Sequence, residues 1–222
     1  MNRTKASSDQ VRGLYAITPD ESDTAGLVGK VRQALAGGAR IVQYRNKAAD
    51  GELRHSQGAA LLELCRAKRV PMIVNDNVEL ALALGADGVH LGREDGDLAA
   101  ARARLGRGKL LGASCYDRLD LAESARDAGA DYVAFGSAFP SETKRGAPRA
   151  PFSLYLEARA RLGLPIVAIG GITRGNAGVL ITAGVDAVAV ISDLFVAPDI
   201  ERRAREFASL FGVHDHEKRS VV

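Results

Sequence analysis

Short apolar runs alternate with amphipathic stretches along almost the whole chain. The runs are rich in Val, Ile, Leu and Ala with little alternation of apolar and polar residues, which is typical of parallel strands buried on both faces. Between them, apolar residues recur at helical spacing, as Leu27, Val31 and Leu35 do. The pattern predicts eight strands, at residues 13–18, 41–45, 71–74, 88–91, 109–115, 131–137, 165–169 and 187–192.

Helices are predicted between the strands and after the last one, at residues 23–36, 50–68, 78–84, 97–105, 119–128, 153–162, 175–183 and 199–211. A short motif also recurs before every second strand: Gly-Ala-Arg-Ile-Val at 38–42, Gly-Ala-Asp-Gly-Val at 85–89, Gly-Ala-Asp-Tyr-Val at 129–133 and Gly-Val-Asp-Ala-Val at 184–188. Its spacing of 44 to 55 residues fits two strand–helix units per repeat. We therefore expect one α/β domain, a (β/α)8 TIM barrel over residues 13–211, with a doubly wound open sheet as the second choice. Residues 1–12 are predicted to be a flexible lead and residues 212–222 a flexible tail.

Composition narrows the function classes. The chain has 222 residues, 46% hydrophobic, which fits a single barrel domain. Its 30 basic and 27 acidic residues are scattered, and the chain has no Trp, so nucleic-acid binding is not expected. The two cysteines have no metal-binding spacing and are read as reduced core thiols of a cytoplasmic protein. From the polar first residues and the lack of a long apolar run, we expect neither a signal peptide nor a membrane span. The sequence leaves open whether the protein is a homo-oligomer.

Acidic residues follow two consecutive strands. Asp76 comes directly after the third strand and Asp95 shortly after the fourth. Because the carboxyl ends of barrel strands meet on one face and carry the chemistry there, both carboxylates are expected in one site. Two carboxylates with few other protein ligands suit Mg²⁺, which shares its remaining positions with water and substrate phosphates. Asp76 and Asp95 are therefore the predicted metal ligands.

Two groups of anion-binding residues are also expected on that face. Arg45 and Lys47 follow the second strand and Lys144 follows the sixth, and these cations can hold a phosphorylated ligand. Gly170 and Gly171 after the seventh strand, with Ser192 after the eighth, occupy the usual phosphate site of a barrel. One anion site coupled to a metal and a second without one suit an enzyme that joins a diphosphate substrate to a monophosphate substrate.

Other polar residues are interpreted as structural. Asp87 and Asp131 lie at helix–strand turns and are given no chemistry. His90 lies inside a strand and is interpreted as a packed barrel histidine rather than a catalytic base.

Seven motifs in order carry a resemblance to a known family: GLYAITP, QYRNK, IVNDNVELALALGADGVHLGRED, LLGASC, FPSETK, PIVAIGGI and AVAVIS. Over residues 13–195 the chain resembles the thiamine phosphate synthases, also called thiamine-phosphate pyrophosphorylases. The resemblance implies a (β/α)8 barrel that couples hydroxymethylpyrimidine diphosphate to a thiazole phosphate or its carboxylated form, giving thiamine phosphate and diphosphate.

The resemblance also implies roles for individual residues. Asp76 and Asp95 would hold Mg²⁺, and Arg45, Ser114 and Lys144 would act in catalysis. The pyrimidine diphosphate would be bound by Gln43, Arg45, Lys47, Asn75, Ser114 and Lys144. The thiazole phosphate would be bound by Ser141 and Thr143 with the backbone of Gly171, Ile191 and Ser192. Two alternatives stay open: a thiazole tautomerase of the same fold, and a regulator that binds a thiamine intermediate without catalysis.

Overall fold

Eight parallel strands close into a barrel in the computed structural model, which describes residues 10–140 and 149–219. Each strand pairs with the next, and the last strand returns to the first, where Gly13 lies opposite Ala187 and Leu14 opposite Val188. This closure confirms the predicted (β/α)8 barrel and excludes the open sheet. The strands are β1 (Gly13–Ile17), β2 (Ile41–Tyr44), β3 (Met72–Asn75), β4 (Gly88–Leu91), β5 (Leu110–Tyr116), β6 (Tyr132–Phe135), β7 (Ile166–Ile169) and β8 (Ala187–Val190).

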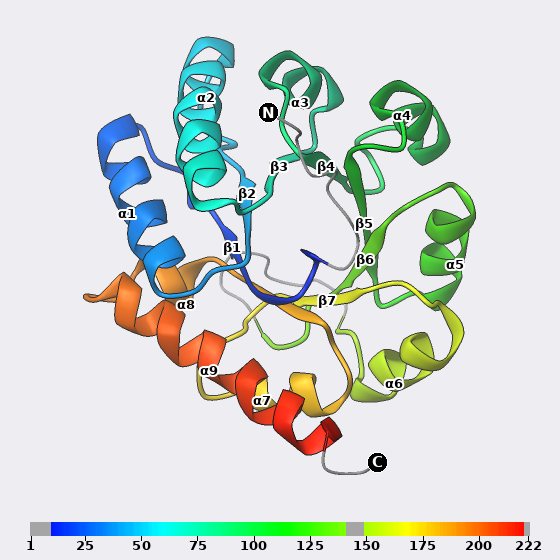
Figure 1. Ribbon diagram of the computed structural model, residues 1–222. Coiled ribbons are helices and arrows are strands. Elements are labelled where there is room, and N and C mark those ends of the chain that lie inside the picture. The colour runs from blue at the N-terminus through cyan, green and yellow to red at the C-terminus, as the bar shows by residue number, and fades with distance from the viewer. Residues whose placement is uncertain (1–9, 141–148, 220–222) are drawn as a thin grey trace.

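Helices surround the barrel, as the view along its axis shows (Figure 1). They are α1 (Thr24–Ala36), α2 (Gly51–Lys68), α3 (Val78–Leu84), α4 (Leu98–Leu105), α5 (Leu119–Asp127), α6 (Phe152–Arg161), α7 (Ala177–Thr182), α8 (Ser192–Phe195) and α9 (Ile200–Arg219). Apart from the short α8, each corresponds to a helix that the apolar periodicity predicts. α8 has a single turn, which is too short for a periodic pattern to reveal.

The apolar residues form two separate layers. The outer layer lies between the strands and the helices and includes Leu14, Val42 and Val89. The inner layer fills the barrel with the alternate residues of the same strands, among them Tyr15, Ile41 and Tyr132. Because successive strand residues point to opposite faces, this alternation fixes which residues reach the barrel interior and its open end.

The recurring motif explains how neighbouring strands are joined at their amino ends. The side chains of Asp87, Asp131 and Asp186 each accept a hydrogen bond from a backbone N–H at the start of the preceding strand, namely those of Met72, Leu111 and Ile166, at 3.0, 2.7 and 2.8 Å. The backbone N–H of each aspartate donates back to that strand, at 3.0, 2.8 and 2.8 Å. The structural interpretation of Asp87 and Asp131 is therefore confirmed.

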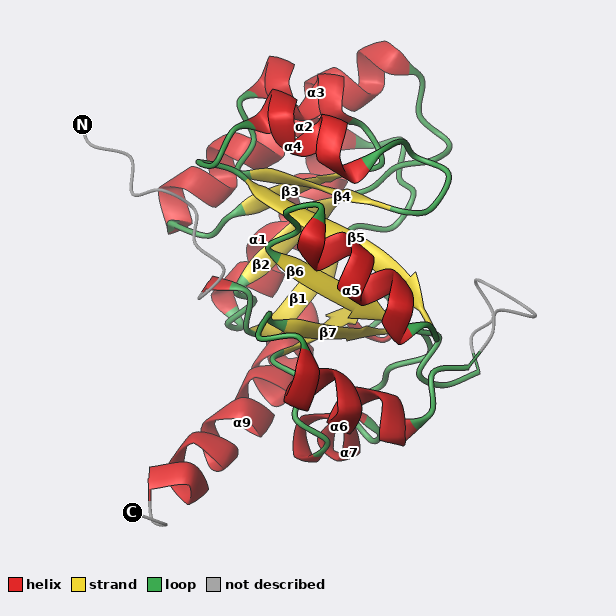
Figure 2. Ribbon diagram, turned by 90° about the vertical axis from the view of Figure 1, so that its right-hand side faces the viewer, coloured by secondary structure: helices red, strands yellow, loops and turns green. Residues whose placement is uncertain are grey.

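The two ends of the barrel domain differ from the predicted bounds. Val11 is buried in the inner layer, so the packed part of the chain begins before Gly13. The last helix, α9, does not end at residue 211 but continues to Arg219, and it extends away from the barrel (Figure 2). In the described residues no helix combines the length and the apolar character that crossing a membrane requires.

Candidate active site

The carboxyl end of β2 presents three of the predicted residues. Gln43 is buried inside the barrel, while Arg45 and Lys47 follow at its rim. The carboxylate of Asp20, just after β1, accepts from the backbone N–H of Lys47 at 2.6 Å and from Nη1 of Arg45 at 3.2 Å. Asp20 therefore orients the guanidinium of Arg45 and fixes the backbone at Lys47, a role that the sequence interpretation missed because it assigned no residue to the end of the first strand.

The two predicted metal ligands lie side by side. The side chain of Asp76 is within hydrogen-bonding reach of Asp95, and the backbone N–H of Gly92 donates to Oδ2 of Asp95 at 2.7 Å. Partial burial, followed by the neighbouring Asp76, raises the pKa of Asp95 above the ordinary aspartate value, although Lys47 opposes this. A carboxylate whose pKa is raised by burial and by a neighbouring carboxylate marks a place where a cation would be strongly stabilised.

Asp76 also has an unusual backbone. Its φ of +62° is in the left-handed region, which few residues other than glycine adopt. Its N–H donates to the carbonyl oxygen of His90 at 2.8 Å, and its carboxylate is 3.3 Å from Nζ of Lys47. A backbone conformation of this kind costs free energy, and such residues cluster at functional sites.

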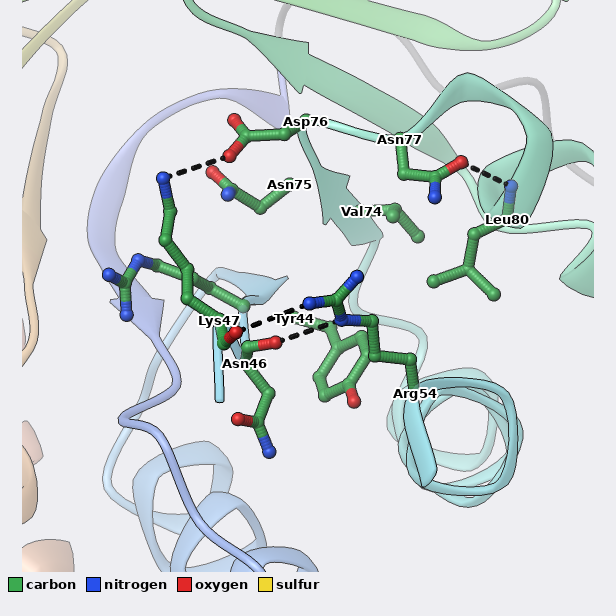
Figure 3. A pocket seen from close by; sticks show the side chains of 10 residues that line it. Tyr44, Asn46, Lys47, Arg54, Val74, Asn75, Asp76, Asn77 and Leu80 are labelled. Carbon is green, nitrogen blue, oxygen red and sulfur yellow. Dashed lines mark hydrogen bonds and ion pairs between the residues drawn. The ribbon is translucent and has the colours of Figure 1, made fainter. Parts of the chain in front are cut away.

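A cavity of about 300 Å³ opens beside these residues, between the ends of β2 and β3. Lys47, Asn75 and Asp76 are on its wall, and Lys47 reaches across toward Asp76 (Figure 3). Arg54 of α2 forms the opposite wall and donates to the carbonyl oxygens of Asn46 and Lys47, at 3.1 and 3.2 Å. Arg54 thus braces the loop that carries Lys47.

The predicted phosphate residues lie at the ends of β7 and β8, on the other side of the barrel opening. Gly170 and Gly171 have φ of +96° and +61°, and a Cβ at Gly171 would be 2.3 Å from the carbonyl oxygen of Pro140. The N-cap residue of α8, Ile191, provides no side-chain hydrogen bond to the first turn, which begins at Ser192. The carboxylate of Asp193 in that turn is held instead by Arg203, at 2.6 Å. Backbone N–H groups at this turn are therefore placed for an anion.

Ser114 lies at the inner face of β5 and is linked to the interior. Nε2 of His90 is hydrogen-bonded to Oγ of Ser114 at 2.9 Å, and Nδ1 of the same ring is hydrogen-bonded to the hydroxyl of Tyr132 at 3.1 Å. His90 is thus a packed barrel histidine, as expected, but it is packed among polar groups. Ser141, Thr143 and Lys144 lie outside the described residues.

Carboxylates, cations and an exposed helix turn at the strand ends of a closed parallel barrel define an α/β-barrel enzyme that handles phosphorylated ligands. The family model described as "Thiamine monophosphate synthase" matches residues 14–194. The chain belongs to this family.

Relatives and a solved structure agree with this assignment. The thiamine-phosphate synthase of Methylobacillus flagellatus is 59% identical over 208 residues, which cover 94% of this chain and 99% of that protein. The thiamine-phosphate synthase of Chromobacterium violaceum is 57% identical over 91% of this chain and 98% of its own length. The structure of thiamine phosphate pyrophosphorylase from Pyrococcus furiosus superposes with a TM-score of 0.82 at 34% identity, covering 93% of this chain and 98% of that one.

Proposed function

We infer that this chain is a thiamine-phosphate synthase. It couples 4-amino-2-methyl-5-hydroxymethylpyrimidine diphosphate to 4-methyl-5-(2-hydroxyethyl)thiazole phosphate and releases thiamine phosphate and diphosphate. The observation that carries this inference is the 59% identity to a synthase over almost the full length of both chains. The paired carboxylates beside Lys47 and Arg45 support it, because a thiazole tautomerase or a binding protein would not need them.

The diphosphate end of the pyrimidine substrate is assigned to the cluster at β2–β4. Arg45 and Lys47 supply positive charge there, and the 60% exposed side chain of Lys47 is free to turn from Asp76 toward a ligand. Asn75, at the end of β3, adds a polar side chain to the same cavity. With Lys144, these groups would neutralise the charge that develops on the departing diphosphate.

Mg²⁺ is proposed as the cofactor, held by Asp76 and Asp95. The donor set fits this ion, because the two adjacent carboxylates offer only oxygen ligands and the described residues contain no cluster of three or more acidic, His or Cys side chains. Bound there, the ion would supply Lewis-acid stabilisation of the diphosphate oxygens. The chain's own part is to hold both carboxylates together, through the N–H of Gly92 on Asp95 and the turn at Asp76.

The thiazole phosphate is assigned to the second anion site. The backbone of Gly171, Ile191 and Ser192, with the hydroxyls of Ser141 and Thr143, would bind it. This second anion site and the β2–β4 cluster lie at different points of the same barrel rim. Such an arrangement suits a reaction that brings two substrates together at one opening. Positioning of the thiazole nitrogen toward the pyrimidine carbon then converts a bimolecular step into an effectively unimolecular one.

The arrangement calls for no covalent catalysis by the protein. The electron-rich aminopyrimidine can stabilise the cation that remains when diphosphate leaves. Cys65 and Cys115 are buried thiols of the outer layer, and burial raises the pKa of each to about 12, so neither is a nucleophile at neutral pH. Two such protonated thiols also support a cytoplasmic location, and a homo-oligomer is compatible with the exposed apolar side chains of α6 and α7.

One assay separates the candidate functions. The purified chain is incubated with both substrates and Mg²⁺, and both diphosphate and thiamine phosphate are measured. Equal amounts of the two products are expected. Isomerisation of a thiazole phosphate alone would indicate the tautomerase, whereas tight binding without any product would indicate the regulator.

A further inference from the structure

Five polar side chains form one continuous line of hydrogen bonds through the barrel interior. Nε2 of Gln43 donates to the hydroxyl of Tyr15 at 2.9 Å, and Tyr15 is 2.9 Å from the hydroxyl of Tyr132. Tyr132 continues to Nδ1 of His90, whose Nε2 reaches Oγ of Ser114. The line therefore connects β2, β1, β6, β4 and β5, and its two ends are residues assigned to the pyrimidine substrate.

The residues of this hydrogen-bonded line are buried, and the surrounding core leaves space for them. Tyr15 and Tyr132 are each 1% exposed, within the otherwise apolar inner layer. Gly112 of β5 makes room for it, since a Cβ there would be 2.1 Å from Tyr132 and 2.5 Å from Nδ1 of His90. A glycine inside a strand weakens the strand, and close approach of another group is a common reason for one.

With Nε2 of Gln43 facing Tyr15 and a neutral His90 ring, the donors and acceptors permit one direction along this line. The amide nitrogen of Gln43 can only donate, so the oxygen of Tyr15 accepts and its proton goes to Tyr132. Tyr132 then donates to Nδ1 of His90, and a neutral ring carries its proton on Nε2. Burial raises the pKa of both tyrosines above the ordinary value, so each hydroxyl stays protonated and can donate one hydrogen bond.

Each end then presents a defined polarity. Nε2–H of His90 donates to Ser114, which leaves the Ser114 hydroxyl hydrogen directed toward a ligand. Within residues 10–140 and 149–219 the side-chain oxygen Oε1 of Gln43 joins no hydrogen bond, whereas the backbone carbonyl oxygen accepts from the N–H of Thr18. No fully buried side-chain polar atom in these ranges lacks a partner, so Oε1 of Gln43 keeps some access to solvent. The opening thus offers an acceptor on the β2 side and a donor on the β5 side.

We propose that Tyr15, Tyr132 and His90 are positioning residues that set this polarity and thereby select an amino-substituted pyrimidine over its oxo counterpart. The proposal rests on the proposed function and on the pyrimidine contacts that the family resemblance implies for Gln43 and Ser114. An exocyclic amine donates to the Gln43 oxygen, and an unprotonated ring nitrogen accepts from Ser114. An oxo pyrimidine reverses both groups, so that two acceptors and two donors would face each other.

The first test observes the histidine itself, without substrate. ¹⁵N NMR of the metal-free protein distinguishes the two neutral tautomers, and the signals of His90 among the chain's four histidines are identified by their loss in His90→Gln. We expect the Nε2–H form in the wild type and a mixture of forms in Tyr132→Phe. A predominant Nδ1–H or doubly protonated ring in the wild type would overturn the one-way line, whether or not the chain is an active synthase.

The second test measures selectivity by titration calorimetry. The ligands are two non-reacting pyrimidine diphosphates, in which CH₂ replaces the leaving oxygen, that differ only in an amino or an oxo group. Tyr132→Phe should lower the affinity ratio between them by roughly 10-fold, about the effect of one hydrogen bond, and Tyr15→Phe by less. The control is Tyr155→Phe, which removes an equally buried hydroxyl from the outer layer and should leave the ratio unchanged.

Neither the tautomer of His90 nor the affinity ratio requires the chain to catalyse the reaction. An unchanged ratio in Tyr132→Phe, or an equal fall in Tyr155→Phe, would refute the positioning role even if the chain makes thiamine phosphate. Failure to make thiamine phosphate, with the expected tautomer and a tenfold fall in the ratio, would instead refute the proposed function alone.

Discussion

Aspartates lie at both ends of the barrel, and their surroundings differ. At the amino ends of the strands, Asp131 accepts from the backbone N–H of Leu111 and pairs with Arg102. At the carboxyl ends, Asp76 and Asp95 lie against each other, and burial together with this contact raises the pKa of Asp95. The same side chain thus joins strands at one end and, at the other, is kept in a repulsive pair that only a cation or a proton relieves.

The largest expected effect concerns metal removal and the loss of one carboxylate. A chelator should abolish activity and added Mg²⁺ should restore it, while Asp76→Ala should lower turnover by roughly 10²–10³-fold, as the loss of one charge-stabilising group does in other enzymes. Steady-state diphosphate release is the measurement. Asp131→Ala serves as the matched control, because it removes a carboxylate from the opposite end. Full activity in the chelator would eliminate the metal role.

The amino-end aspartate should matter for stability instead. Asp131→Ala leaves the backbone N–H of Leu111 and part of Arg102 without their acceptor, so the free energy of unfolding should fall by about 1–3 kcal/mol. Turnover per folded molecule should stay close to that of the wild type, because Asp131 lies at the amino ends of the strands, at the opposite end of the barrel from the site. Denaturant unfolding measures the first quantity.

A suitable control is Asp127→Ala, because Asp127 is 68% exposed and pairs only at the surface with Arg126. Its effect should be below about 0.5 kcal/mol. If Asp127→Ala and Asp131→Ala cost the same, the strand-joining role of the repeated aspartates would be wrong.

The next prediction divides the carboxyl end into its two anion sites. Lys144→Ala should raise the apparent KM for the pyrimidine diphosphate by about 10-fold, the loss of one charged contact. Ser192→Ala should act on the thiazole phosphate, and more mildly, because backbone N–H groups at α8 remain. Initial rates with each substrate varied in turn give both values, and exposed Lys68 at the far end of the barrel supplies the control Lys68→Ala. Equal effects of Lys144→Ala and Ser192→Ala on the same substrate would contradict two separate sites.

The smallest expected effect is a gain in the free energy of unfolding, opposite in sign to the loss expected for Asp131→Ala. Asp76→Asn removes one of two adjacent negative charges and places a residue that tolerates φ > 0 at a φ of +62°. It loses only an ion pair with Lys47, which is 60% exposed. The metal-free protein should therefore gain between zero and about 1 kcal/mol in the free energy of unfolding. A clear loss of stability would show that Asp76 is structural after all.

The sequence is most informative where the signal is periodic or local. Apolar runs and the repeated glycine motif predict all eight strands, and the position of Asp76 and Asp95 just after strands predicts that they meet. Local signals can also be overlooked: Asp20 follows the first strand in the same way, yet it was not among the predicted site residues.

The interior line of hydrogen bonds could not be predicted in this way. Tyr15 and Tyr132 are 117 positions apart and meet only because β1 and β6 face each other inside the closed barrel. In the sequence both resemble ordinary apolar strand residues, since a tyrosine hydroxyl leaves no trace in a hydrophobic pattern. The backbone conformation of Asp76 is likewise set by the turn between β3 and α3 and not by residue type.

Closure of the barrel has a consequence for the nascent chain. β1 has β8 as one neighbour, and the N–H of Gly13 donates to the carbonyl oxygen of Asp186 at 2.8 Å, so one edge of β1 stays open until β8 has left the ribosome. At about 5–20 residues per second, that interval is on the order of 10 s. An open strand edge of this kind can pair with another chain during that time. The proposed second anion site would be completed by Gly171 and Ser192 in the same late segment, so a substrate bound there would stabilise only a chain whose synthesis is nearly finished.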